Sequence, residues 1–264
     1  MHYMKPYDET TPGSNTTVLI KTEDKKTIEN TDLNISRISI FITDLGLQKV
    51  PLDLAKLTDS QISFGISTYA ANLSSIASES LDQGRSTAIL LPTQVFNSAK
   101  YDPGPSALLI SDSVSESARK FKNILSRLNS NRLGVYFASD SIFTMRKESI
   151  LNILNILEDN SDKFKFIAYY DTLHGEFMTN IISSSNIAGK AIVINNIIDT
   201  SLIENDIITS LENLAELSLK NKSVAVGSIS PTKISLAIVQ KWLAINKDRV
   251  ILIPLDDLVH EKKG

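Results

Sequence analysis

Short, strongly apolar segments recur along this chain from Arg37 to Val259, and stretches with the period of a helix separate them. The apolar segments are rich in β-branched residues and are continuous, which is typical of parallel strands buried on both faces. The strand candidates are Ile38–Ile42, Ile62–Ile66, Ala88–Leu91, Leu133–Phe137, Phe164–Ala168, Ala191–Ile194, Val224–Val226 and Val250–Ile253. Their alternation with helices predicts an α/β domain built on a mainly parallel sheet.

The segments between the strand candidates carry helix signals. Ser113 and Glu116 have the spacing of a capping box, and Ser201 and Glu204 repeat that spacing before a second amphipathic stretch. Pro231 stands where the first turn of a later helix is expected. Periodicity does not decide whether the sheet closes into a barrel or stays open in a doubly wound fold. The chain lacks G-x-G-x-x-G after its first strand candidate and lacks a Walker loop, which favours the barrel.

Composition excludes several classes of function. The 264 residues include 27 basic and 30 acidic side chains, and the net charge of −3 gives no reason to expect nucleic-acid binding. The chain has no cysteine, which excludes disulfides, thiolate metal sites and cysteine nucleophiles. It has three histidines, two of them near the ends, so a histidine-rich metal site is hard to build. No apolar run reaches the length of about 18 residues that a transmembrane helix needs.

Residues 1–36 differ from the rest of the chain. They are polar and interrupted by Pro6, Pro12 and Gly13, which predicts a linker or an arm before a domain over residues 37–264. One short apolar piece, Val18–Ile20, is suited to a sheet edge or a groove. The first residues have no signal-peptide apolar stretch, so we expect any export signal to lie upstream of this chain.

Polar residues gather directly after the strand candidates, where parallel α/β folds place their chemistry. Asp44 and Asp171 are the candidate catalytic carboxylates, and Asp44 with His174 is the candidate pair for a metal ion. The candidate substrate-binding residues are Tyr69, Gln94, Tyr136, Asp140, Asn195 and Ser228. Hydroxyls, amides and tyrosine rings suit a neutral polyhydroxylated ligand, because they hydrogen bond to its hydroxyls and stack on its faces.

Each charged candidate also has a structural interpretation. Asp44 has the position of a turn aspartate, and His174 that of a surface or cap residue. The sequence supports no Ser-His-Asp arrangement, because G-x-S-x-G is absent. A carboxylate pair for glycoside hydrolysis, drawn from Asp44, Asp140 and Asp171, stays open.

Five motifs at the strand ends resemble those of the divergent polysaccharide deacetylases, a bacterial branch of the NodB-like carbohydrate esterases. They are, in chain order, Ile40-Phe-Ile-Thr-Asp-Leu-Gly-Leu47, Ser67-Thr-Tyr-Ala-Ala-Asn-Leu73, Tyr101-Asp-Pro-Gly-Pro-Ser-Ala-Leu-Leu109, Gly134-Val-Tyr-Phe-Ala-Ser-Asp-Ser-Ile-Phe-Thr144 and Ala225-Val-Gly-Ser-Ile-Ser-Pro-Thr232. The resemblance covers about residues 37–255. It implies a distorted NodB-like (β/α) barrel of seven or eight mainly parallel strands, and a zinc site that removes N-acetyl groups.

The chain departs from this family pattern at the implied metal ligands. Thr43 replaces the first aspartate of the opening pair and leaves Asp44, while Ser228 and Ser230 replace both histidines of G-H-P-H. The remaining departures are Ala138 for a histidine, Arg85-Ser86 for H-E and Thr93-Gln94 for M-E. A catalytic zinc normally needs about three protein ligands and an open position for water, so the departures predict a degenerate metal site.

Three hypotheses follow. The first is a barrel without a cofactor that keeps a cleft for a carbohydrate or a peptidoglycan-type glycan. The second is an active, zinc-dependent or other divalent-metal N-deacetylase with a rearranged site that uses Asp44, Asp140, Asp171 and His174. The third is a non-catalytic scaffold of the cell envelope. The resemblance also implies a periplasmic or envelope-associated location.

Overall fold

The computed structural model describes residues 35–96, 100, 102–127, 130, 132–139, 141–170 and 177–259, with the backbone alone at 143, 144 and 177. These residues belong to one compact unit that spans 33–264. The predicted arm lies outside the described residues except for its last two positions, so its character stays a prediction. No helix in the described part of the chain is long and apolar enough to cross a membrane.

One sheet of nine strands forms the centre of the described structure, and every ladder in it is parallel. The strands are β1 Ser36–Leu45, β2 Ser63–Ile66, β3 Thr87–Leu91, β4 Gly134–Phe137, β5 Ile167–Tyr170, β6 Ala191–Ile194, β7 Asn196–Ile197, β8 Ala225–Ile229 and β9 Val250–Leu252. Their order is β6-β5-β4-β3-β2-β1-β8-β7, with β9 on the first residues of β1. Each of the eight strand candidates overlaps an observed strand. The ninth strand, β7, was not predicted from the sequence.

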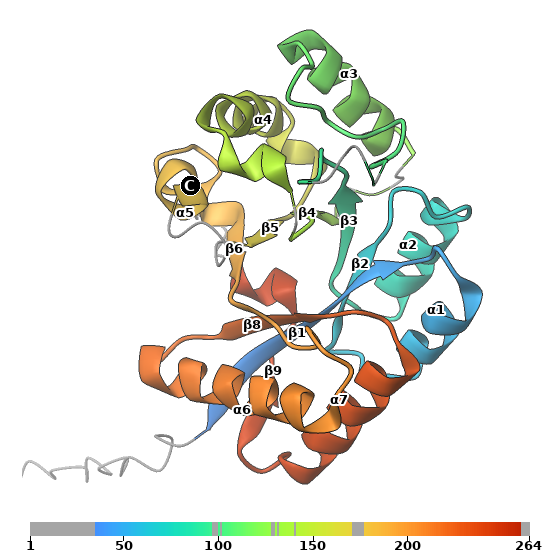
Figure 1. Cartoon of the computed structure of the whole chain (residues 1–264), viewed down its shortest axis with the longest axis vertical. Coiled ribbons are helices and arrows are strands. Elements are labelled where there is room, and N and C mark those ends of the chain that lie inside the picture. The colour runs from blue at the N-terminus through green and yellow to red at the C-terminus, as the bar shows by residue number, and fades with distance from the viewer. Residues whose placement is uncertain are drawn as a thin grey trace, which may run out of the picture. The chain divides into compact units, whose positions relative to one another are not determined.

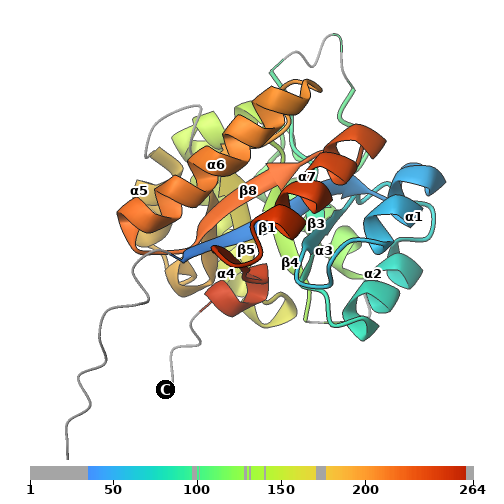
Figure 2. The same cartoon turned by 90° about the horizontal axis from the view of Figure 1, so that it is seen from below.

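The described residues form seven α-helices, which pack around the outside of the sheet (Figure 1). They are α1 Lys49–Lys56, α2 Leu73–Asp82, α3 Val114–Leu125, α4 Lys147–Asp159, α5 Phe177–Ser183, α6 Glu204–Asn221 and α7 Lys233–Ile245. α6 and α7 lie side by side and cover the face of the sheet near β1 and β8 (Figure 2).

Of three predicted helix starts, the structure confirms one and shows that two are wrong. Ser113 caps α3, because its Oγ accepts a hydrogen bond from the Glu116 backbone N–H at 3.2 Å. Ser201 does not cap α6: the helix begins only at Glu204, and the Ser201 hydroxyl donates to Asp206 at 2.7 Å instead. Pro231 does not open α7, because Thr232 takes the cap position and accepts from the backbone N–H of Ser235.

The sheet closes where β6 continues through Asn195 into β7. The Asn195 backbone N–H donates to the Val226 carbonyl at 2.8 Å, and the Val226 N–H donates to the Asn195 side-chain oxygen at 2.8 Å. β7 then forms a ladder with β8. One continuous segment thus pairs with β5 first and with β8 afterwards, which confirms the distorted (β/α) barrel.

Alternate strand residues fill the inside of this barrel. The inner cluster consists of Phe41, Ala88, Leu90, Tyr136, Phe166, Ala168, Ile192, Ile194, Val226 and Leu255. The rings of Phe41 and Tyr136 meet edge to face at 5.0 Å. Gly65 makes room for them, because a Cβ there would lie 2.7 Å from the Phe41 ring and 3.0 Å from the Tyr136 ring. A second, larger cluster packs the outer face of the strands against the helices.

A short 3-10 turn, η4 (Leu255–Leu258), closes the end of the barrel where the strands begin. The Leu255 N–H donates to Ser63 Oγ at the start of β2, and the Asp256 N–H donates to Ser86 Oγ just before β3, both at 3.0 Å. Lys165 forms an ion pair with Asp256 at 3.0 Å. The opposite end, where the strands finish, holds the polar residues.

Replacing Asn195 with leucine is expected to lower the free energy of unfolding by about 1–3 kcal/mol, because the buried N–H of Val226 loses its acceptor. Asn196→Leu is the matched control, since the Asn196 side chain makes no hydrogen bond within the described residues. Urea unfolding of both variants measures the difference. Equal stabilities would mean that the Asn195 side chain does not help to close the barrel.

Candidate functional site

A cavity of about 340 Å³ opens at the ends of β1, β4, β5 and β8. We call it the carboxyl-end cavity, and its lining comprises Thr43, Asp44, Tyr136, Ala138, Ser139, Tyr170, Ile197, Asp199, Ser228, Ile229 and Ser230. Two other cavities, of about 400 and 470 Å³, lie where strands begin, and a third, of about 310 Å³, lies at the start of α2. Because parallel α/β folds place their chemistry at the carboxyl ends of strands, the carboxyl-end cavity is the candidate site.

Asp44 occupies a left-handed turn at the edge of this cavity. Its φ of 57° lies in a region that most residues with a Cβ enter at a cost and that aspartate and asparagine enter more readily. The ladder between β1 and β2 shifts register between Ile42 and Leu45, so the strand bends where Asp44 emerges. The Tyr136 hydroxyl accepts from the Asp44 backbone N–H at 3.1 Å and donates to Asp44 Oδ1 at 3.4 Å. Tyr136 thereby helps to hold the turn in place.

Tyr136 is a permanent hydrogen-bond donor at neutral pH. Its side chain is fully buried, and burial together with the negative charge of Asp44 raises the pKa of its phenol well above the ordinary value. The phenol therefore keeps its proton. A neutral phenol can donate to the Asp44 carboxylate, whereas a phenolate would repel it.

Asp199 is the functional candidate that sequence analysis missed. It follows β7, and its side chain is 8% exposed. Both carboxylate oxygens accept from the Ser230 N–H, at 3.1 and 2.9 Å, and Oδ2 also accepts from Ser235 Oγ at 2.7 Å. Asp199 thus fixes the loop between β8 and α7. The signal in the sequence is an aspartate that follows two apolar residues, Ile197 and Ile198. These residues lie beyond Ile194, where the predicted strand ends.

Two largely buried residues with hydroxyl groups, Thr43 and Ser228, line the carboxyl-end cavity. Thr43 is 7% exposed, and its hydroxyl has no hydrogen-bond partner among the residues that the structure describes. Ser228 is 2% exposed, and its hydroxyl makes one long contact, 3.5 Å, to the Asn196 carbonyl. Among the described residues, the fully buried side-chain oxygen without a partner is that of Ser39, so the Thr43 oxygen keeps some accessible surface and a ligand that enters the cavity can reach it.

The structure brings together three of the predicted site residues, Asp44, Tyr136 and Ser228. Three others lie outside the cavity lining. The Tyr69 hydroxyl donates to the Pro103 carbonyl at 2.7 Å, Gln94 Oε1 accepts from the Ile110 N–H at 3.0 Å, and Asn195 closes the barrel. Asp140, Asp171 and His174 lie outside the described residues.

The positions where the chain departs from the family pattern fall into two groups. Thr43, Ala138, Ser228 and Ser230 line the carboxyl-end cavity. Arg85 instead binds the end of α1, where its guanidinium donates to the carbonyls of Thr58 and Asp59 at 2.7 and 2.6 Å. The other members of the second group are Ser86, which accepts from the Asp256 N–H, Thr93, which bonds to Ser141 at 2.6 Å, and Gln94, which accepts from the Ile110 N–H.

Residues 40–259 match the model of a family described as divergent polysaccharide deacetylase. The chain belongs to this family. The resemblance carried by the five strand-end motifs is therefore confirmed. No curated protein matches the chain.

Solved structures share the fold. A protein of Agrobacterium tumefaciens C58, described as uncharacterized, has a TM-score of 0.74 at 16% identity, over 86% of this chain and 90% of its own. A putative cellobiose-phosphate cleavage protein of Enterococcus faecalis V583 has a TM-score of 0.56 at 8% identity, over 86% of this chain and 100% of its own. At these identities the likeness concerns the fold alone.

The described lining of the cavity does not fit the zinc ion that the family resemblance implies. It offers carboxylates, hydroxyls and phenols, whereas zinc sites are built mainly from histidine and cysteine with some carboxylates. Among the described residues, no group of three or more His, Cys, Asp or Glu side chains could hold a metal ion.

We expect Asp44→Gly to be about 1 kcal/mol more stable than Asp44→Ala. Both variants lose the carboxylate, but only alanine keeps the penalty of a left-handed φ. The same pair at Asp53, an exposed position within α1, is the control and should reverse the order, because glycine weakens a helix. Denaturant unfolding of the four variants gives both differences. If Asp44→Ala were at least as stable as Asp44→Gly, the left-handed φ at position 44 would carry no cost for alanine.

Proposed function

We propose that this family member binds an envelope glycan in the carboxyl-end cavity and that its metal site is degenerate. Thr43 lines the cavity as a residue that is only 7% exposed, and its hydroxyl has no hydrogen-bond partner among the described residues; this is the observation that carries the proposal. A sugar hydroxyl both donates and accepts, so it would satisfy Thr43 and improve the poor geometry of Ser228. The family match to divergent polysaccharide deacetylases supports a carbohydrate as the ligand.

The size and surface of the cavity support the same ligand class. Ligand pockets generally measure about 300–1,000 Å³, and this one, at about 340 Å³, is suited to one sugar unit of a chain that continues outside it. Tyr170 offers an aromatic surface beside the hydroxyls. Aromatic rings with nearby polar groups suit the apolar faces and polar edges of sugars.

The replacement of metal ligands by serines supports loss of the family chemistry. Ser228 and Ser230, which stand where the family motif has histidines, both line the cavity, so the exchange lies within the site itself. Hydroxyls of serine are weak ligands for zinc. Losing a general base costs about 10²–10⁴-fold, and losing the charge of a metal adds several kcal/mol to the barrier.

Replacing Thr43 with valine keeps the shape of the side chain and removes its hydroxyl. We expect this variant to bind tetrasaccharides of N-acetylglucosamine, glucosamine and glucose about tenfold more weakly, because one buried hydrogen bond to the ligand is lost. Thr209→Val, at an exposed position on α6, is the control. Isothermal titration calorimetry measures the affinities. No binding of any of the three glycans to the unmodified protein would overturn the glycan-binding proposal.

The degenerate metal site has a separate test. We expect the purified protein, after dialysis against zinc, to retain no stoichiometric metal and to release no acetate from N-acetylglucosamine oligomers. Plasma mass spectrometry and an acetate assay measure these two quantities. Zinc-dependent release of acetate that disappears in Asp44→Asn would establish an active deacetylase with a rearranged site instead.

A further inference from the structure

We propose that the carboxyl-end cavity selects an amino sugar with a free ammonium group over the same sugar in its N-acetylated form. This inference rests on the proposed glycan-binding function and names the ligand class more closely. Asp44 and Asp199 both line the cavity, and its described lining includes no lysine, arginine or histidine. The described lining is therefore negative, which favours a cationic ligand over a neutral one of equal size.

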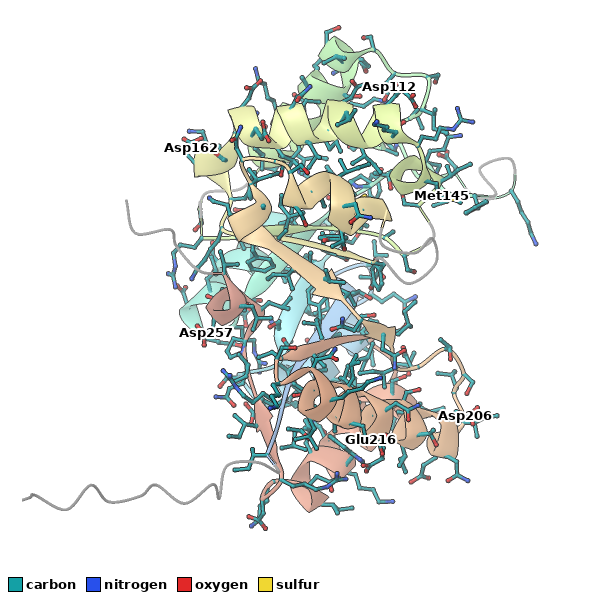
Figure 3. All side chains as sticks on the ribbon, turned by 90° about the vertical axis from the view of Figure 1, so that its left-hand side faces the viewer. Asp112, Met145, Asp162, Asp206, Glu216 and Asp257 are labelled. Atoms are coloured by element: carbon teal, nitrogen blue, oxygen red, sulfur yellow. The ribbon has the colours of Figure 1, made fainter. Side chains whose placement is uncertain are left out.

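Asp199 supplies a buried charge that no described cation neutralises. Its described partners are the Ser230 N–H and the Ser235 hydroxyl, both of them neutral donors. A carboxylate can accept about four hydrogen bonds, and the described partners use two sites on Oδ2 and one on Oδ1. One acceptor site on Oδ1 is thus not used by the described partners. Acidic residues such as Asp206 and Glu216 on α6 are exposed to water instead (Figure 3), where their charge is screened.

Thr43 independently points to a ligand with a hydroxyl group. It directly precedes Asp44 and lines the same cavity wall as a residue that is 7% exposed, and its hydroxyl has no partner among the described residues. A ligand that hydrogen bonds to Thr43 and contacts the carboxylate of Asp44 carries a cation beside a hydroxyl. A 2-amino sugar without its acetyl group has this arrangement, with the ammonium and hydroxyls on neighbouring ring carbons.

Acetylation would remove the feature that the cavity recognises. It turns a cationic donor into a neutral amide, which forms weaker hydrogen bonds to carboxylates. The ligand of this protein would then be the product of the reaction from which its family takes its name. A deacetylation carried out by another enzyme must supply that ligand, and this protein would recognise glycan already processed.

Isothermal titration calorimetry with tetrasaccharides of glucosamine, N-acetylglucosamine and glucose tests the inference. We expect glucosamine to bind about tenfold more tightly than the other two. This ratio should fall when salt is raised from about 0.01 M to about 1 M, because salt screens ion pairs. Equal affinities for the three glycans would overturn the amine preference and leave glycan binding intact. Absence of binding by all three would overturn both proposals.

Asp44→Asn locates the preference within the site. Asparagine tolerates a left-handed φ, so the turn is retained while the charge is removed. We expect the ratio of glucosamine to N-acetylglucosamine affinity to fall toward one. Asp53→Asn, which removes an exposed charge on α1, is the matched control and should leave the ratio unchanged. A ratio that stays high in Asp44→Asn and Asp199→Asn alike would overturn the assignment to these carboxylates.

Discussion

The structure depends on a single segment that pairs with two different strands. β6 belongs to the β5 side of the sheet, and its continuation through Asn195 into β7 belongs to β8. Without this change of partner the sheet would have two open edges, and the loops after β1 and β7 would not face each other. Closure therefore creates the cavity as well as the barrel, and it brings Asp199 to the loop after β8.

The residues that give the cavity its shape are not the residues that replace the histidines of the family motif. The strands, the inner packing of Phe41 against Tyr136 and the turn at Asp44 maintain the shape of the site. The serines at the two histidine positions change only what lines it. Under the proposed function, the fold would have lost a metal and kept a polar cleft, because hydroxyls form hydrogen bonds without the strict geometry that a metal demands.

Most of the fold could be predicted from the sequence, because strands buried on both faces leave continuous apolar runs. β7 could not, since Asn196 and Ile197 form a strand only through contacts with β8 that are distant in sequence. Asp199 was missed for the same reason. The helix starts at Glu204 and Lys233 show how a spacing can suggest a cap that local geometry gives to another residue. Similarly, no pattern reveals that the Tyr69 hydroxyl binds the Pro103 carbonyl.

The pairing of β1 with β8 and β9 has a consequence for how the chain folds during synthesis. β1 pairs with two strands that are made long after it, and Leu255 reaches back to Ser63 across 192 residues. The nascent chain must therefore carry β1 with one edge unpaired until β8 has left the ribosome. Such late, long-range pairing makes folding slow and exposes apolar strand edges to other chains, so the growing polypeptide is the form most in need of chaperones.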